Sequence, residues 1–449
     1  MKFKIFKYSI VVSVLLLFSV SLSAQAQDSS IKYVNGKTLC EYSGLDMPKT
    51  DGGSIAVCNT ESGFMIYEKN HDQKIPPAST VKVMTAIIAY ENISDKSEKI
   101  TITKSVVNES TGLKLGLKAG DSYTAEDLIR AVLICGSNDA ANQLAEYVSA
   151  GNKTAFIQMM NQKASDIGCT STRFTNVTGL HDPNMYTTAS DLLKIASYAY
   201  NLGEIAEWSS SSSYSFKPLE DPDNYKLRYN RNDFISRSTT SKYYYKGATG
   251  LNSGYTPEAG NCLITSASKN GMTYICVIMN TPSVEGDDTN YAYLDAKSIL
   301  NFCFDSFEIK NVVDTKSVVS EVPLKLSANK DYVSLFPADS VYHILPTKLE
   351  ENDLSYEKII YSEEYSAPVK EGTEFGELII KYKNDYIIGK TKLISHESSE
   401  RSPVLFMIEN IKNFVTGTFF IVTLITAAIL FTIYTIVTVR IRRKRYWYK

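Results

Sequence analysis

Apolar positions along this chain change their spacing several times, and each spacing predicts a different element. Two short apolar runs at 54–59 and 63–68 are joined by a polar turn and indicate a β-hairpin. Later runs predict helices over 113–150, 153–167, 188–200 and 292–302, and strands over 243–254, 263–268 and 272–279. Asp121 or Thr124 is a suitable N-cap for the longest helical stretch. Strands first, helices next and strands last predict an α+β domain whose first and last strands pair in one antiparallel sheet.

The pattern becomes short and alternating after residue 308. Val322, Leu324 and Leu326 recur at every second position, and further runs of this kind continue to residue 394. We therefore expect a first domain over 47–308 and a small all-β domain over 309–397.

The N-terminal residues have the anatomy of a secretory signal peptide. Lysines at positions 2, 4 and 7 precede an apolar run from Ile10 to Val20, and Ala24-Gln25-Ala26 is a small-x-small cleavage site. We expect residues 1–26 to be a signal peptide, which implies export.

The C-terminal residues predict a membrane anchor. After a linker over 398–412, residues 413–439 contain no charged side chain and are long enough to span a bilayer. A basic tail over 440–449 follows, and positive charge favours the cytoplasmic side. The expected location is therefore the cell membrane, crossed once, with the rest of the chain outside the cytoplasm.

Composition excludes several classes of function. The chain has 449 residues, 44% hydrophobic and 21% charged, which is typical of globular domains. A formal net charge of −2 gives no basis for binding nucleic acid. Seven cysteines and four histidines show no metal-binding spacing, so we expect no metal and no cofactor.

The first candidate catalytic residues lie in the segment Pro76-Pro77-Ala78-Ser79-Thr80-Val81-Lys82. Two prolines lead into apolar residues at helical spacing, so we expect Ser79 at or just inside a helix N-terminus. Ser79 and Lys82 are three residues apart, which places both side chains on one face of a helix. A neutral, desolvated lysine can accept the proton of a serine hydroxyl and so create a nucleophile. The same spacing also arises by chance, as a helix cap followed by a solvated lysine.

Two downstream segments strengthen the catalytic interpretation of Ser79 and Lys82. Gly136-Ser137-Asn138-Asp139 falls in the predicted helical stretch, and Gly250-Leu251-Asn252-Ser253-Gly254-Tyr255-Thr256 falls in a predicted strand. Together the three segments resemble Ser-x-x-Lys, Ser-x-Asn and Lys-Thr-Gly, the signatures of penicillin-binding proteins and serine β-lactamases. Flanking residues 178–184 and 254–260 resemble the low-molecular-weight, serine-type D-Ala-D-Ala carboxypeptidases. The resemblance extends over about residues 53–307, and the β domain is similar to that family's C-terminal domain less specifically.

The resemblance implies a penicillin-binding/β-lactamase-like domain, an antiparallel sheet with a helical cluster. It implies that Ser79 attacks a D-Ala-D-Ala bond of a peptidoglycan stem peptide and forms an acyl-enzyme that water hydrolyses, with β-lactam antibiotics as acylating ligands. Lys82 would accept the proton, Asn138 would hold the substrate backbone, and the N–H groups of Ser79 and Tyr255 would form the oxyanion hole. The implied substrate-binding positions are Ser137, Asn252, Ser253, Gly254, Tyr255 and Thr256.

Two positions depart from the family pattern. Gly136 stands where the family has a serine that relays protons, and Ser137 lies one residue later, about 100° away if the helix is continuous. Asn252 stands where the family has a lysine, which removes a cation that helps to bind the substrate carboxylate. We therefore expect reduced activity or a changed substrate. Candidate substitutes for the missing cation are Arg228, Arg231, Arg237 and Lys269.

Two other functions remain as alternatives. A degenerate member of the family could bind peptidoglycan or penicillin without turnover and act as a scaffold. A β-lactamase is less favoured, because no counterpart of the class A deacylating glutamate is evident.

Overall fold

The computed structural model describes residues 31–235 and 242–446, with side chains up to residue 443. The chain divides into two compact units, Met1–Asn301 and Phe302–Lys449. The predicted signal peptide over 1–26 lies outside the described residues.

The first unit is built on a five-stranded antiparallel sheet with the strand order β2-β1-β9-β8-β7. The interior strand β1 pairs with β2 on one side and with β9 on the other, which confirms the predicted hairpin and the pairing of first and last strands. Every residue of β1 is buried, as an interior strand covered on both faces requires. The sheet strands are β1 Ser54–Asn59, β2 Met65–Lys69, β7 Ala248–Thr256, β8 Gly260–Lys269 and β9 Met272–Thr281. Two further strand pairs are β3 Lys99–Thr101 with β4 Ser122–Thr124, and β5 Ser213–Phe216 with β6 Lys226–Tyr229.

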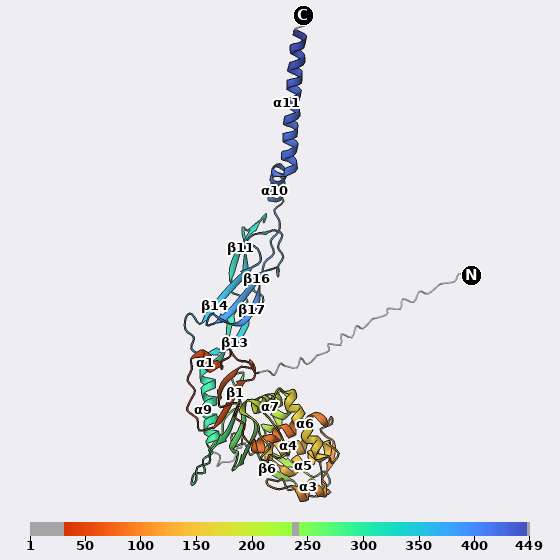
Figure 1. Cartoon of the computed structure of the whole chain (residues 1–449), viewed down its shortest axis with the longest axis vertical. Coiled ribbons are helices and arrows are strands. Elements are labelled where there is room, and N and C mark those ends of the chain that lie inside the picture. Colours follow the sequence, from red (N-terminus) through yellow and green to blue (C-terminus); the bar gives the residue numbers. More distant parts are fainter. Residues whose placement is uncertain (1–30, 236–241, 447–449) are drawn as a thin grey trace, which may run out of the picture. The chain divides into compact units, whose positions relative to one another are not determined.

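Helices cover both faces of this sheet, and Figure 1 shows the cluster containing α4–α7 on one side and α9 on the other. Helix α2 is buried from its first residue, Lys82, through Ala89, so it forms the centre of the cluster. Thr124 caps α4 in a reciprocal pair with Asp127, which settles the predicted choice of N-cap. The helices are α1 Leu39–Ser43, η1 Ala78–Val81, α2 Lys82–Asn92, α3 Lys104–Glu109, α4 Ala125–Cys135, α5 Asn138–Val148, α6 Lys153–Asp166, α7 Ala189–Asn201, α8 Glu204–Ser209 and α9 Tyr291–Ser306.

The helical stretch predicted over 113–150 is wrong in one respect that matters for function. Gly136 adopts the left-handed conformation, with φ 61° and ψ 32°, and ends α4. Ser137 then begins α5 as its N-cap, accepting a hydrogen bond from the backbone N–H of Ala140. Because the two residues flank a break between helices, the rotation expected from a continuous helix does not apply to them.

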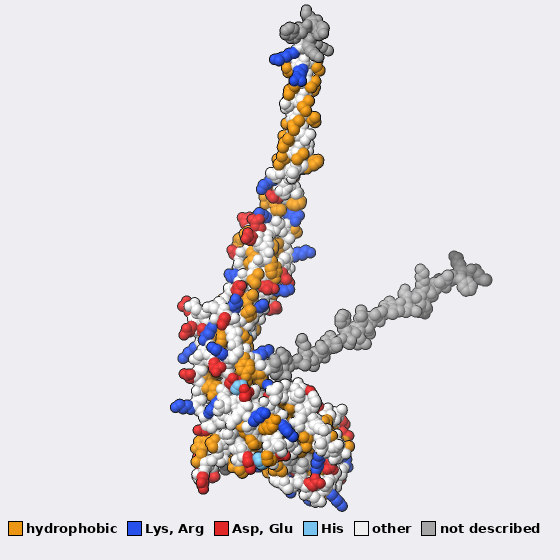
Figure 2. All heavy atoms as spheres, in the orientation of Figure 1, with side chains coloured by type: hydrophobic (Ala, Val, Ile, Leu, Met, Phe, Trp, Pro, Cys, Tyr) orange, Lys and Arg blue, Asp and Glu red, His pale blue; other side chains and the backbone are white. Residues whose placement is uncertain are grey.

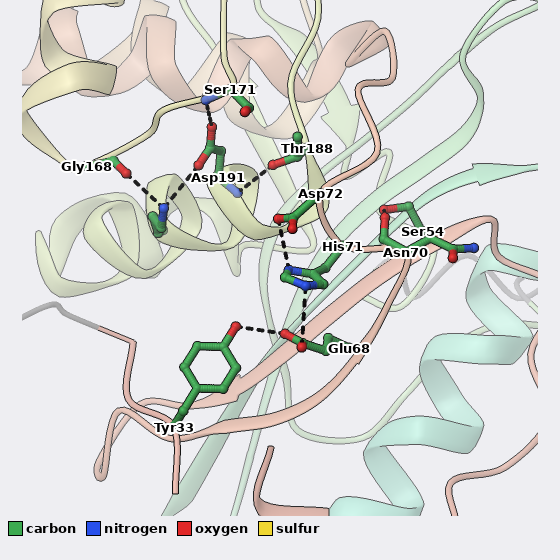
Figure 3. A network of polar contacts seen from close by, with 11 residues as sticks. Tyr33, Ser54, Glu68, Asn70, His71, Asp72, Gly168, Ser171, Thr188 and Asp191 are labelled. Atoms are coloured by element: carbon green, nitrogen blue, oxygen red, sulfur yellow. Dashed lines mark hydrogen bonds and ion pairs between the residues drawn. The ribbon is translucent and has the colours of Figure 1, made fainter. Parts of the chain in front are cut away.

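A buried carboxylate fixes the loop that precedes α7. Asp191 accepts a hydrogen bond from the backbone N–H of Ser171 at 2.7 Å and forms an ion pair with Lys194 at 3.1 Å. Lys194 also donates to the carbonyl of Gly168 at 2.8 Å, and these contacts are drawn in Figure 3. The loop over 168–188 leads into α7, and these contacts hold the start of the loop against that helix. This loop carries a residue of the candidate site described below.

The second unit is all β apart from its C-terminal helices, as predicted. A six-stranded sheet has the order β14-β16-β17-β12-β11-β15, and β10 pairs with β13 in a separate ribbon. On β11, Val322 and Leu324 are buried while their neighbours are not, so the alternation read from the sequence marks the core face. The strands are β10 Phe307–Val313, β11 Ser320–Lys325, β12 Tyr332–Pro337, β13 Val341–Pro346, β14 Leu354–Ile360, β15 Tyr365–Ser366, β16 Glu374–Tyr382 and β17 Tyr386–Ser395.

Two helices separated at Gly417 end the chain, α10 Pro403–Thr416 and α11 Thr418–Tyr446. Most of the linker predicted over 398–412 is therefore helical, with Ser402 as N-cap of α10. Residues 418–443 are long and apolar enough to cross a membrane, a stretch that begins and ends a few residues later than the span predicted over 413–439. Figure 2 shows hydrophobic side chains along α11.

Candidate active site

Ser79 and Lys82 lie together at the N-terminal end of the central helix, as predicted. Ser79 is in the 3₁₀ turn η1, and Lys82 is the first residue of α2. The Lys82 Nζ atom is 3.0 Å from the Ser79 Oγ atom and 2.5 Å from the carbonyl oxygen of Thr178, to which it donates a hydrogen bond. The predicted pair is therefore within proton-transfer reach.

Lys82 is completely buried, and this sets its chemistry. Burial lowers the pKa of the Lys82 amine to about 7, and the positive charge of Arg231 adds to this decrease. No carboxylate forms an ion pair with Lys82 among the described residues. A substantial fraction of the amine is thus neutral near pH 7 and able to accept a proton from Ser79.

Two glycines allow neighbouring segments to approach the nucleophile closely. A Cβ atom at Gly179, where φ is 78°, would lie only 1.9 Å from the carbonyl oxygen of Ala78. A Cβ atom at Gly254 on β7 would lie 2.5 Å from the backbone nitrogen of Ser79. Both distances are far below a van der Waals contact, so any side chain at either position would displace the segment that carries Ser79.

A cavity of about 450 Å³ opens beside Ser79. Its size suits a small peptide. All three sequence segments contribute to its wall, together with the loop after α6, the loop after β6 and α9. The polar and charged lining residues are Ser79, Asn138, Thr178, Arg231, Asn232, Asp233, Asn252, Ser253, Tyr255, Thr256, Asn261, Asn290 and Tyr293.

The second segment contributes Asn138 to the cavity but not Ser137. Asn138 donates from Nδ2 to the carbonyl of Thr111 at 2.7 Å, which fixes its side-chain amide. The Ser137 hydroxyl is fully buried, contacts the Asp139 carboxylate and accepts a hydrogen bond from the backbone N–H of Leu115. Ser137 is absent from the cavity wall, which differs from its predicted substrate contact, because its hydroxyl serves the helix junction instead.

The third segment lines the cavity along β7. Asn252, Ser253, Gly254, Tyr255 and Thr256 all contribute to the wall. Asn252 is 3% exposed, whereas the Tyr255 side chain is 53% exposed at the rim. The structure therefore brings together every predicted site residue except Ser137.

Three buried amides of the cavity wall leave a polar atom without a hydrogen-bond partner in the described part of the chain. These atoms are Oδ1 of Asn138, Nδ2 of Asn232 and Nδ2 of Asn252, on residues that are 3%, 2% and 3% exposed. Unpaired buried polar atoms are costly, and a ligand with matching donors and acceptors would satisfy them. The wall thus offers one acceptor and two donors to a polar ligand.

Of the three candidate cations that the structure describes, only Arg231 lines the cavity. Arg228 instead donates to the carbonyl oxygens of Leu227 and Leu115. Lys269 ends β8 five residues beyond Ile264, the partner of Asn252, a separation of roughly 17 Å along a strand. Arg237 lies outside the described residues.

Sequence reasoning missed Thr178, Asn232, Asp233 and Tyr293 as parts of the cavity wall. The only local signal is the polar run Asn230-Arg231-Asn232-Asp233 between two apolar stretches. Tyr293 gives no such signal, because it is one aromatic residue in an apolar helix.

Other polar clusters have structural explanations. Within residues 31–235 and 242–446, no group of three or more His, Cys, Asp or Glu side chains is arranged so that it could hold a metal ion. Figure 3 shows His71 between Glu68 and Asp72, with the Tyr33 hydroxyl donating to Glu68 at 2.7 Å, a network that fastens the N-terminal segment to β2. His181 lies 3.7 Å from Glu258 and is not part of the cavity wall.

Comparison with known proteins decides the family. The family model for D-alanyl-D-alanine carboxypeptidase (Peptidase_S11) matches residues 43–283, more than half of the chain. The chain belongs to this family. It is a serine hydrolase, and residues 307–401 match the C-terminal domain of penicillin-binding protein 5.

Relatives of this family cover most of the chain. A D-alanyl-D-alanine carboxypeptidase of Bacillus subtilis, DacF, is 26% identical over 78% of this chain and 86% of its own length. DacA of Haemophilus influenzae is 28% identical over 62% of this chain and 68% of its own length.

Solved structures agree on the fold. Penicillin-binding protein 5 from Haemophilus influenzae covers 80% of this chain and 100% of its own, with a TM-score of 0.57 and 24% identity. The Streptomyces K15 DD-transpeptidase covers 58% of this chain and 99% of its own, with a TM-score of 0.52 and 26% identity.

The close approach at Gly179 generates a test. We predict that Gly179→Ala slows labelling by a fluorescent penicillin at least about tenfold, because the new methyl group displaces Ala78 and Ser79, and that it also lowers the melting temperature. Gly168→Ala is the matched control, since Gly168 has φ 84° and nothing within 4 Å of its Cβ position. It carries only the cost of a left-handed alanine, about 1–2 kcal/mol, and should label at the wild-type rate. Equal labelling by Gly179→Ala and the wild type would contradict this account.

Proposed function

We propose that this protein is a membrane-anchored D-alanyl-D-alanine carboxypeptidase that removes the terminal D-alanine from peptidoglycan stem peptides through an acyl-enzyme on Ser79. The observation that carries the proposal is the 3.0 Å contact between Ser79 Oγ and the buried Nζ of Lys82. The family and its relatives support the reaction class.

In the acylation step, the Ser79 oxygen bonds to the carbonyl carbon of the penultimate D-alanine while its proton passes to the neutral amine of Lys82. The negative charge on the former carbonyl oxygen is stabilised by the backbone N–H groups of Ser79 and Tyr255. The carbon–nitrogen bond then breaks, and the departing amino group of the terminal D-alanine takes the proton from Lys82.

In the deacylation step, water attacks the ester carbonyl and gives its proton to Lys82, which returns it to the Ser79 oxygen as the shortened peptide leaves. Asn138 is suited to hold the peptide backbone, because its Oδ1 is unpaired and its amide is fixed by Thr111. The family's relay hydroxyl is missing at Gly136, and the Ser137 hydroxyl contacts Asp139. We therefore expect slow turnover.

A direct assay tests the reaction. We predict that the full-length protein in detergent releases D-alanine from diacetyl-L-Lys-D-Ala-D-Ala, and that Ser79→Ala abolishes release because the nucleophile is gone. Ser165→Ala, an exposed position on α6, is the matched control and should retain wild-type release. D-Alanine is measured with a coupled amino-acid oxidase.

Penicillin labelling separates this proposal from the alternative. Labelling at Ser79 with no detectable D-alanine release would favour the scaffold that binds without turnover. Release that persists in Ser79→Ala would remove Ser79 from the mechanism.

Membrane anchoring by α11 rests on its length, its apolar composition and its basic end. Residues 418–443 have the properties of a spanning helix, and Arg440, Arg442 and Arg443 lie at their C-terminal end. By the positive-inside rule, this arrangement supports the proposal that the catalytic unit lies outside the cytoplasm.

Cell fractionation tests the anchor. We predict that the full-length protein stays in the membrane pellet after carbonate extraction at high pH, because the anchor is held by apolar contacts with lipid, and that external protease digests the catalytic unit in spheroplasts. Deletion of the residues after Ser402 should release the protein as a soluble enzyme. Recovery of the full-length chain in the carbonate supernatant would refute the anchor.

A further inference from the structure

The proposed substrate ends in a carboxylate, but the strand that lines the cavity offers no cation to bind it. Asn252 is neutral, and Ser253 to Thr256 carry no charge. Among the described residues of the cavity wall, only Arg231 and Asp233 are ionisable as a cation or a carboxylate. An incoming carboxylate therefore meets one positive side chain in this wall.

The backbone of Arg231 is held from several sides. Its N–H donates to the carbonyl of Ile134 at the end of α4 at 3.0 Å. Its carbonyl accepts from the hydroxyls of Ser253 on β7 and Tyr293 on α9, each at 3.4 Å. The backbone of Arg231 is thus hydrogen-bonded to α4, β7 and α9, and these bonds set its position in the cavity wall.

The neighbours of Arg231 strengthen this position. Asn230 is 3% exposed and donates from its side chain to the carbonyls of Ser209 and Ser211. Asn232 is 2% exposed and accepts from the backbone N–H of Phe234. Two buried asparagines therefore fix the chain on both sides of Arg231, which lines the cavity.

The side chain of Arg231 passes over the second segment. Its Cδ atom lies 3.8 Å from the position that a Cβ atom would take at Gly136. No ion pair of its guanidinium is present within residues 31–235 and 242–446. Its charge nevertheless reaches the catalytic amine, because it contributes to the lowered pKa of Lys82. Burial raises the pKa of the Asp233 carboxyl, and the charge of Arg231 opposes this rise, so the two side chains interact electrostatically. Arg231 thus combines a positive charge with proximity to the reacting atoms.

Asn252 and Asn232 supply donors beside this charge. Each has a buried Nδ2 without a partner in the described part of the chain, and both line the same cavity as Arg231. A carboxylate has two oxygens and about four acceptor sites, so it can accept from a guanidinium and an amide together. A neutral amide at 252 also avoids adding a third positive charge close to Lys82 and Arg231.

We propose that Arg231 binds the C-terminal carboxylate of the substrate, with the Asn252 amide as a second donor, and so replaces the cation missing from β7. This inference rests on the proposed function. It makes Arg231 the residue that selects a free carboxylate over a neutral C-terminus.

Pairs of ligands that differ only at the carboxylate test whether Arg231 binds this group. One pair is diacetyl-L-Lys-D-Ala-D-Ala and its C-terminal amide, compared by kcat/KM. The other pair is benzylpenicillin and its methyl ester, compared by the acylation rate of the full-length protein. We predict that Arg231→Ala lowers both rates for the free acid about 10–100-fold, as expected for losing charge-assisted hydrogen bonds. The rates for the amide and the ester should change less than about threefold.

Three variants make the test specific. Arg228→Ala removes a cation three residues away that does not line the cavity, and should leave both ratios of acid to neutral ligand unchanged. Arg231→Gln removes the charge but keeps much of the side chain, and should reproduce the effect of alanine if the alanine variant is unstable. Arg231→Ala combined with Asn252→Lys restores a cation from the strand side and should recover preference for the acid.

The outcome distinguishes this inference from the proposed function. Equal losses on acid and neutral ligands, or no loss on the acid, would overturn the role of Arg231 while leaving the carboxypeptidase intact. If the wild type releases no D-alanine, the proposed function fails. The comparison of benzylpenicillin with its methyl ester still decides whether Arg231 binds the carboxylate.

Discussion

Burial of the Lys82 amine beside the Ser79 hydroxyl is the constraint on which the rest of the site depends. An exposed lysine would be charged at neutral pH and could not accept a proton. Lys82 begins a helix that is buried through Ala89 at the centre of the helical cluster, so the fold itself supplies the desolvation. The carbonyl of Thr178 gives the amine a neutral partner, which satisfies a hydrogen bond without raising the pKa as a carboxylate would. Gly179 and Gly254 then let a loop and a strand close around the pair.

The remaining cavity wall is polar but carries little charge. The amides of Asn138, Asn232 and Asn252 line this wall, and each leaves one buried atom without a partner in the described part of the chain. These polar atoms have no partner within the described chain, so they are available to form hydrogen bonds with a bound ligand. A single arginine next to a partly neutral lysine gives the site one fixed positive charge. Adding a second one close by would lower the pKa of Lys82 further.

Local patterns in the sequence predict much of this arrangement. The Ser79 and Lys82 spacing, the hairpin at 54–68 and the cap at Thr124 all follow from residues close together in the chain. The break at Gly136 was missed because helical spacing continues on both sides of it, and only the glycine marks the end of the helix. Ser137 was expected among the substrate-binding positions from the family resemblance, and its place at the junction of α4 and α5, outside the cavity wall, depends on this break.

Arg231 shows the other limit of sequence reasoning. It is one of four candidate cations, and the polar run around it does not by itself show that it lines the cavity while Arg228 does not. What places it in the cavity is long-range packing, since its backbone bonds to α4, β7 and α9. Its partner Ile134 lies 97 residues earlier in the sequence and its partner Tyr293 lies 62 residues later, so the fold must bring these segments together before the position of Arg231 is set. The break at Gly417 between α10 and α11 was missed for a simpler reason, because apolar residues continue through it.

Direct titration of the Lys82 amine tests the central claim. With ¹³C-labelled lysine, the Cε signal that disappears in Lys82→Arg can be followed by NMR as a function of pH. The lowered pKa means that the amine is protonated below about pH 7 and neutral above it, so its capacity to accept the Ser79 proton rises with pH through that value. The account predicts a titration midpoint near 7. A midpoint close to the ordinary lysine value of about 10.4 would contradict it, because the amine would then be charged whenever the enzyme works.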